Sequence, residues 1–243
     1  YIHSKTGTQL LTTNVQIYTT MDPLTNIVLS AASKALIDPI ISNFLQPKLE
    51  KLKIYFKRKQ LYNLVESHAF NNLFTSYLDR TINHCTHINT LVFPNARIEL
   101  KTIYEPLTIN PAIGEGGVLL DKHFDTSFLA TNSRLLISDN AGMGKSTLTK
   151  FLCLRLIEST KCIPVLVELR KISQNNSLLK EILRQIQPLD NAFDEELVLK
   201  FFEVGLFTVI LDGFDEVERE HQQQVISDIK FLVSKASRCE FIL

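Results

Sequence analysis

The sequence has little that would indicate a secreted, membrane-spanning or strongly charged protein. Its four cysteines, Cys85, Cys153, Cys162 and Cys239, are scattered with no C-x-x-C pair, which favours a reducing, cytoplasmic compartment. No apolar run approaches the roughly twenty residues that a bilayer-spanning helix needs, and no signal-peptide pattern opens the chain. Basic and acidic residues number 26 each, so no net charge attracts nucleic acid or anionic lipid.

The length of 243 residues predicts one or two domains with enough apolar material for a core. Met21 is followed by Asp22 and Pro23, a typical helix start with aspartate at the N-cap and proline at the first helical position. We therefore expect residues 1–20 to be a non-native or disordered leader. The chain stops at residues 239–243, within a strand pattern, so we expect the natural protein to continue.

Residues 21–88 are predicted to form a helical N-terminal module. Apolar residues recur at helical spacing from Leu24 onward and again from Leu61 to Ile82, and kinks or breaks are expected near Pro39 and Pro47. Residues 89–133 lose this period and gain turn formers, which indicates a connector with extended segments. Within it, residues 98–104 alternate apolar and polar side chains as a half-buried strand does, and glycines near residue 115 are interpreted as a flexible link.

A basic run lies inside the helical module. It contains Lys48, Lys51, Lys53, Lys57, Arg58 and Lys59, with Tyr55 and Phe56 among them. Contact with nucleic acid or lipid is one interpretation. We favour the other, a solvated helix face whose apolar residues pack inward.

The most informative stretch is residues 138–147, which follow an apolar run and precede a helical pattern. It resembles the phosphate-binding pattern G-x-x-x-x-G-K-[ST], except that Asp139 occupies the first glycine position. Such a loop turns backbone N–H groups toward a phosphate, its lysine reaches the β and γ oxygens, and its hydroxyl holds Mg²⁺. The predicted nucleotide-binding residues are Asn140, Ala141, Gly142, Met143, Gly144, Lys145, Ser146 and Thr147.

A second landmark lies some seventy residues downstream. An apolar strand at residues 207–211 ends in Asp212, and Asp215 and Glu216 follow one turn later. Because Mg²⁺ prefers hard oxygen ligands, Asp212 and Ser146 are the predicted metal ligands. Asp215 and Glu216 are the predicted catalytic residues, which would orient or deprotonate the attacking water.

These motifs predict an α/β fold over residues 134–243. We expect a P-loop NTPase core with a parallel sheet flanked by helices, preceded by the all-α module. The run at residues 163–169 is typical of a strand buried between helices in such a sheet, and helices are predicted at residues 178–186 and 195–203.

Three segments together resemble the NACHT branch of the STAND NTPases. They are D-N-A-G-M-G-K-S-T in the loop, C-I-P-V-L-V-E-L-R in the strand after it, and V-I-L-D-G-F-D-E-V around Asp212. The placement of Gly213 between Asp212 and the later acids is the most specific element. The helical module and the segment Tyr104 to Leu107 are similar to what precedes the NTPase domain in short bacterial NACHT proteins, which are related to NLR receptors and act in antiphage defence.

The resemblance implies a regulatory switch in which ADP holds a closed state and exchange for ATP, with Mg²⁺, permits oligomerisation in innate immune, antiphage signalling. Its implied partners are nucleotide, further copies of the full-length protein and an unknown sensed ligand. It implies that the strand after the acidic one lies beside the loop strand, and that a sensor arginine and winged helix follow Leu243. We therefore expect poor ATP hydrolysis by this chain alone.

Two alternatives stay open. One is a P-loop ATPase that acts on nucleic acid through the basic run. The other is a non-hydrolysing helical interaction module with a structural nucleotide. A guanine-specific enzyme is not favoured because no N-K-x-D base-reading motif occurs.

Overall fold

The chain is described by a computed structural model over residues 30–58, 69–88, 98–113, 116–140, 142–187 and 194–243. The predicted leader, the start at Met21, and Ala141 of the phosphate-binding loop lie outside the described residues. None of the described helices is long and apolar enough to cross a membrane.

A four-stranded sheet, in which every neighbouring pair is parallel, forms the centre of the carboxyl-terminal part of the described chain. Its order is β5-β8-β7-β6, and its strands are β5 Arg134–Leu135, β6 Ile163–Glu168, β7 Phe207–Asp212 and β8 Glu240–Ile242. β8 lies between β5 and β7, with Phe241 opposite Arg134 on one side and Val209 on the other. The predicted parallel sheet flanked by helices is confirmed.

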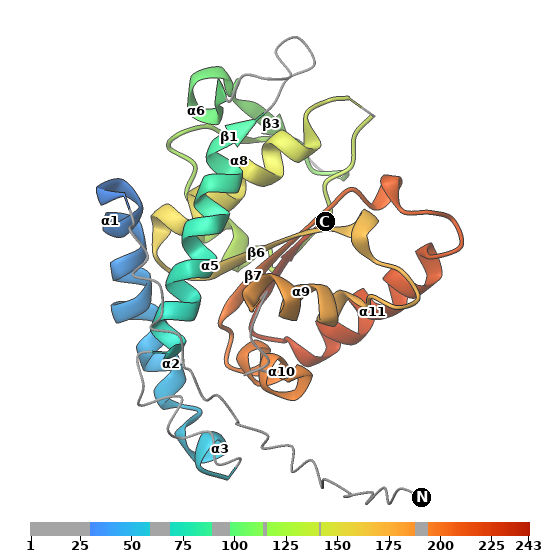
Figure 1. Cartoon of the computed structure of the whole chain (residues 1–243). Helices are drawn as coiled ribbons and strands as arrows, with labels where there is room; N and C mark the ends of the chain where they lie inside the picture. Colours follow the sequence, from blue (N-terminus) through green and yellow to red (C-terminus); the bar gives the residue numbers. More distant parts are fainter. Residues whose placement is uncertain (1–29, 59–68, 89–97, 114–115, 141, 188–193) are drawn as a thin grey trace, which may run out of the picture.

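Helices cover both faces of the sheet (Figure 1). α8 packs on β6 and β7 through the apolar side chains predicted for its inner face, Leu148, Phe151, Leu152 and Leu156. On the other side lie α9, α10 and α11. Ser177 and Asp194 begin α9 and α10, because their side chains accept the N–H groups of Lys180 and Leu197. These helices are α8 Lys145–Ser159, α9 Leu178–Ile186, α10 Glu195–Glu203 and α11 Gln222–Lys235.

The amino-terminal helices continue through both prolines where kinks or breaks were expected. A π-helical segment, η1, lies between Pro39 and Pro47, and the N–H of Gln46 donates to the carbonyl of Ile41, five residues earlier. The changed hydrogen-bond spacing accommodates a proline that has no N–H to offer. The elements are α1 Ala31–Pro39, η1 Ile40–Leu45, α2 Gln46–Glu50, α3 Lys53–Arg58 and α5 Ala69–Thr86.

α5 joins the helical module to the sheet. β6 is an edge strand, and the buried hydroxyl of Tyr77 in α5 donates to the carbonyl oxygen of its Pro164 at 2.8 Å. This bond satisfies a buried carbonyl on the side of β6 where the described part of the chain places no neighbouring strand. Next to it, Phe70 and Phe74 of α5 lie edge-on to Phe201 of α10, with ring centroids 6.1 and 5.8 Å apart.

The connector pairs short strands and carries one helix that the alternating pattern did not predict. Only Ile98 and Glu99 of the expected strand pair as a strand, because residues Leu100–Ile103 form α6. The helix places Leu100 and Tyr104 four residues apart on one face, and Tyr104 stacks on Phe151 of α8 with ring centroids 3.9 Å apart. The connector elements are β1 His87–Ile88, β2 Ile98–Glu99, α6, β3 Leu107–Ile109, β4 Val118–Leu120 and α7 Ser127–Thr131.

The glycines interpreted as a flexible link lie between two paired strands. β3 and β4 are antiparallel, and Gly117 directly precedes Val118, the first residue of β4. A Cβ atom at Gly117 would lie 2.5 Å from the Asn110 Oδ1 atom and the Thr108 Cγ2 atom. A larger residue at position 117 would therefore force the side chains of Asn110 and Thr108 to shift.

Lys48 departs from the interpretation of the basic run as a solvated face. Its ammonium donates to the carbonyl oxygens of Val204 and Gly205, at 3.0 and 2.6 Å, just after α10 ends. Burial lowers its pKa, and its Nζ lies 4.8 Å from the ring centroid of Phe44. Lys48 thus binds the carboxyl end of α10, where unpaired carbonyls and the helix dipole favour a cation.

We expect Lys48→Met to reduce the free energy of unfolding by about 1–3 kcal/mol, because two carbonyl oxygens lose a charged donor. Urea denaturation of both variants measures the effect, with Lys51→Met as the matched control because Lys51 is exposed. Equal unfolding midpoints for the two variants would contradict a docking role for Lys48.

Candidate functional site

The phosphate-binding loop connects β5 to α8 with the backbone that its glycines predict. Gly142 and Gly144 have φ angles of 83° and 85°, in the left-handed region, and Gly144 directly precedes the first residue of α8. Nothing lies within 4 Å of a Cβ at either position, so conformation rather than space calls for glycine. The loop therefore presents the amino terminus of α8 at the carboxyl edge of the sheet, where a doubly wound fold binds its ligand.

Lys145 links this loop to the acidic landmark. Its Nζ atom donates to the carbonyl oxygens of Asp139 and Asn140 at 3.0 and 3.2 Å. It also lies 3.5 Å from Oδ2 of Asp215. The predicted phosphate-contacting lysine and one predicted catalytic carboxylate thus meet across the site.

Asp139, the departure from the glycine pattern, has a local role in the loop. Its Oδ1 accepts the N–H of Asn140 at 2.7 Å. The carboxylate therefore accepts a hydrogen bond from the backbone of its own loop, which is a local structural role for an acidic residue at this position.

Asp212 and Ser146 lie together, as predicted for metal ligands. Burial raises the pKa of Asp212, the carboxylates of Glu216 and Glu168 add to the rise, and hydrogen bonds from the side chains of Ser146 and Thr149 oppose it. A carboxylate and a hydroxyl are hard oxygen donors, and a crowded, half-buried carboxylate is relieved by a bound cation. The donor set therefore fits Mg²⁺. Thr149, one turn along α8, was missed by the sequence motif.

A glycine turn separates the roles of the later acids. Gly213 has a φ of 76° and begins η3, the 3-10 helix Phe214–Glu216. Asp215 is directed to Lys145, whereas Glu216 accepts a hydrogen bond from Nη1 of Arg170 at 3.0 Å. The two predicted catalytic residues therefore have different partners.

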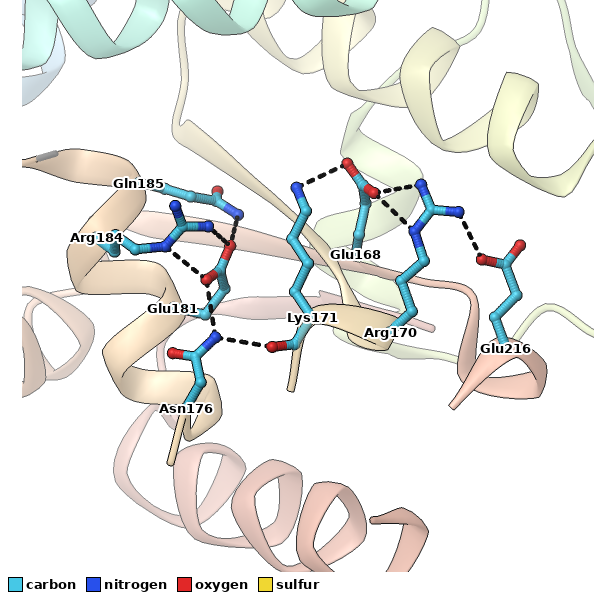
Figure 2. Close-up of polar contacts among 8 residues, drawn as sticks. All are labelled: Glu168, Arg170, Lys171, Asn176, Glu181, Arg184, Gln185 and Glu216. Carbon is cyan, nitrogen blue, oxygen red and sulfur yellow. Dashed lines mark hydrogen bonds and ion pairs between the residues drawn. The ribbon is translucent and has the colours of Figure 1, made fainter. Parts of the chain in front are cut away.

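Glu168 and Arg170 are site residues that the sequence motifs missed. Arg170 lies in η2, Leu169–Lys171, and donates through Nη2 and Nε to Oε2 of Glu168 at 2.6 and 3.1 Å (Figure 2). Lys171 donates to the other oxygen of Glu168 at 3.0 Å. Burial would raise the pKa of Glu168, but the bonds from Lys171 and Arg170 outweigh it and lower the pKa.

These two residues belong to the site because β6 and β7 are neighbours. Glu168 is the register partner of Asp212. Arg170 therefore bridges two carboxylates at the ends of adjacent strands, Glu168 as the last residue of β6 and Glu216 after β7. The available signal was the position of both residues at the carboxyl end of a buried strand, where parallel sheets gather their functional side chains.

A cavity of about 220 Å³ lies between the loop and the acidic cluster. Its polar wall includes Ser138, Asp139, Lys145, Thr149, Asp212 and Asp215, and its apolar wall includes Leu136, Leu148 and Ile242. Lys145, the Asp212 carboxylate and the Thr149 hydroxyl line this cavity next to the glycine loop, and this arrangement can hold a polyphosphate with its cation.

Residues 133–242 match the NACHT domain family. The match supports a NACHT-domain protein, and a NACHT domain implies a nucleotide-binding NTPase of the STAND type, usually with Mg²⁺. The NACHT match contains the loop, Arg170 and the acidic cluster, and it leaves the helical module and most of the connector outside. At the stringency applied, neither the curated proteins nor the solved structures contain a match.

Proposed function

We propose that the NACHT domain of this protein is an ATP/ADP-binding regulatory switch that couples nucleotide exchange and slow hydrolysis to self-association in innate immune, antiphage signalling. The observation that carries the nucleotide part is the position of Lys145, between two loop carbonyls and Asp215. The signalling and self-association parts rest on the resemblance to short bacterial NACHT proteins.

In this proposal the loop residues Asn140 to Thr147 surround the phosphates. Lys145 donates to the β and γ oxygens, and Ser146 and Asp212 hold the cation, which neutralises charge on the phosphates when bound. Because a phosphate competes with Asp215 for Lys145, nucleotide binding would release the Asp215 carboxylate. Asp215 would then accept a hydrogen bond from the attacking water, and Glu216, held by Arg170, would help to orient it.

Slow turnover follows from the same contacts. Lys145 neutralises Asp215, an acid that would otherwise act on water, and this contact must rearrange before hydrolysis. We therefore propose that the nucleotide acts mainly as a state-holding ligand. A non-hydrolysing module would bind nucleotide without any turnover, and a nucleic-acid motor would be stimulated by DNA. Engagement of Lys48 with α10 removes one cation from the surface that a motor would use.

The experiment is thermal unfolding with ATP or ADP, with and without Mg²⁺, on the wild-type chain and Asp212→Asn. Nucleotide at a hundred times its dissociation constant should stabilise the wild-type fold by roughly 2.7 kcal/mol. We expect Asp212→Asn to lose the Mg²⁺-dependent part of this shift, because it removes the charged ligand beside Ser146.

The same variant separates a binding defect from misfolding. Burial and two neighbouring acids raise the pKa of Asp212, so its charged form disfavours the folded state. We therefore expect Asp212→Asn without nucleotide to unfold at a temperature no lower than wild type. Asp38→Asn, at an exposed position of α1, is the charge-matched control. A full Mg²⁺-dependent shift in Asp212→Asn would contradict the assignment.

A further inference from the structure

A second cavity, the α5–α9 cavity, lies beside the edge strand β6, and Glu168 on its wall also belongs to the candidate functional site. Its volume is about 280 Å³, and its walls come from α5, β6, η2 and α9. Arg80, His84, Lys171 and Arg184 line it, together with the acids Glu168 and Glu181. It shares no lining residue with the cavity at the phosphate-binding loop.

The acids of the α5–α9 cavity are already bonded to donors. Glu181 has a fully buried side chain and accepts from Nε and Nη2 of Arg184 at 2.9 and 2.8 Å. Asn176 and Gln185 donate to the same carboxylate at 3.1 and 3.2 Å (Figure 2). Burial would raise the pKa of Glu181, but these bonds lower it, so the group stays ionised and has its oxygens occupied. Glu168 is occupied in the same way by Arg170 and Lys171.

The cations of the cavity retain donor groups. Arg80 donates from Nη1 to Oγ of Ser76 at 2.8 Å and from Nη2 to the carbonyl of Gln185 at 3.0 Å, both neutral oxygens. Arg184 has Nη1 as its remaining amino group, and the ammonium of Lys171 has three N–H bonds, one of them directed to Glu168. Figure 2 shows the Lys171 side chain between the Glu181 and Glu168 clusters. Arg80, Arg184 and Lys171 carry three positive charges against the two negative charges of Glu168 and Glu181, so these lining residues have a net positive charge.

His84 responds to this excess of positive charge. Burial lowers its pKa, and Lys150 and Lys171 lower it further, while Glu168 acts in the opposite direction. An anion placed among these cations would raise the pKa of the His84 imidazole, so that pKa reports whether the cavity is occupied.

We propose that the α5–α9 cavity binds a small phosphate-bearing molecule. Arg80 and Arg184 offer planar guanidinium groups whose paired donors match phosphate oxygens, and Lys171 adds a third cation from η2. A cavity of about 280 Å³ has room for a small molecule, so we take a free small molecule as its occupant. The phosphate-binding loop does not line this cavity, so its ligand is distinct from the nucleotide of the proposed function.

The test follows the imidazole signals of His84 by NMR during titration with inorganic phosphate, with the signals assigned by His84→Gln. We expect phosphate to raise the pKa of His84 in the wild-type chain and in Lys145→Ala, whose phosphate-binding loop is impaired. Arg80→Gln should weaken this response roughly tenfold, because a charged donor is lost. Arg58→Gln, which removes an exposed arginine of α3, should respond as wild type.

Several outcomes would overturn the proposal. They are an unchanged phosphate affinity in Arg80→Gln, loss of the His84 response in Lys145→Ala, or an equal response to acetate at the same concentration. The amide spectrum reports whether Arg80→Gln is folded. If it is not, Arg80→Lys keeps the charge without the planar fork, and wild-type affinity in that variant would also overturn the proposal.

Discussion

Lys145→Ala is expected to remove the thermal stabilisation that ATP and ADP give to the wild-type chain. The ammonium is the cation at the centre of the loop, and it lies within 3.5 Å of two loop carbonyls and Asp215. Its loss leaves the phosphates without their main charge partner and leaves Asp215 unpaired beside them. At a concentration that stabilises the wild type by roughly 2.7 kcal/mol, we expect a shift near zero.

The control for this prediction is Lys150→Ala on the same helix. Lys150 donates to the carbonyl of His87 at 3.5 Å, in the connector. It should therefore retain the full nucleotide shift even if its basal stability changes. A normal shift with Lys145→Ala would refute the site, whereas loss of the shift in both variants would indicate a general effect on α8. Differential scanning fluorimetry and direct binding of a fluorescent nucleotide measure the two variants side by side.

Phe201→Ala is expected to lower the free energy of unfolding by roughly 3–5 kcal/mol. The Phe201 side chain is fully buried, and its ring lies 6.1 Å from that of Phe70, 5.8 Å from that of Phe74 and 6.1 Å from that of Phe207. These partners come from α5 and β7, so truncation opens a cavity where the helical module meets the NACHT domain. A loss of this size is a large fraction of a typical domain's stability.

The measurement is urea denaturation followed by two probes, circular dichroism and tyrosine fluorescence. Because the aromatic cluster is shared, we expect both probes to report one transition that moves to lower urea. Phe231→Ala is the matched control, since Phe231 in α11 is 46% exposed, and it should change stability by well under 1 kcal/mol. A transition in which α5 melts before the sheet would show that the two parts fold separately.

The sheet and its helices could be predicted because their hydrophobic patterns agree with the tertiary contacts that they make. The buried runs at β6 and β7 are apolar except for Thr208, whose hydroxyl donates to Glu240, so they are stable only between helices. That requirement was visible in the sequence. The helices predicted at residues 178–186 and 195–203 are α9 and α10, because each has a capping side chain and an apolar face. Local chemistry and the fold agree in this part of the chain.

The connector was harder because short elements depend on what they touch. The alternation at residues 98–104 suits a strand, but the stacking of Tyr104 on Phe151 of α8 favours a turn of helix instead. The role of Lys48 was equally hard to predict, since its partners are carbonyl oxygens far along the chain. Because every residue has a backbone carbonyl, the sequence does not show which carbonyls bind a lysine, and Lys48 resembles an ordinary surface lysine.

The candidate site also contains residues that a local motif predicts and residues whose role depends on the tertiary fold. Lys145, Ser146 and Asp212 lie in motifs whose spacing reflects the shape of the ligand, and the structure brings them together. Arg170 and Glu168 lie in no such motif, and their role depends on the neighbouring register of β6 and β7. Whether these residues bind nucleotide as proposed is what the Lys145 and Asp212 variants decide.

The position of β8 has a consequence for the order of events during synthesis. The strand that carries the phosphate-binding loop has no sheet neighbour among the described residues other than β8, which is synthesised after β6 and β7. Until residues 240–242 emerge, β6 and β7 can pair but β5 cannot join them. Because pairing between distant segments is slow, the nascent protein keeps an exposed sheet edge until β8 has been made. The strand that carries the phosphate-binding loop therefore joins the sheet after β6 and β7 can pair, so the nucleotide site forms later than the pair of strands beside it.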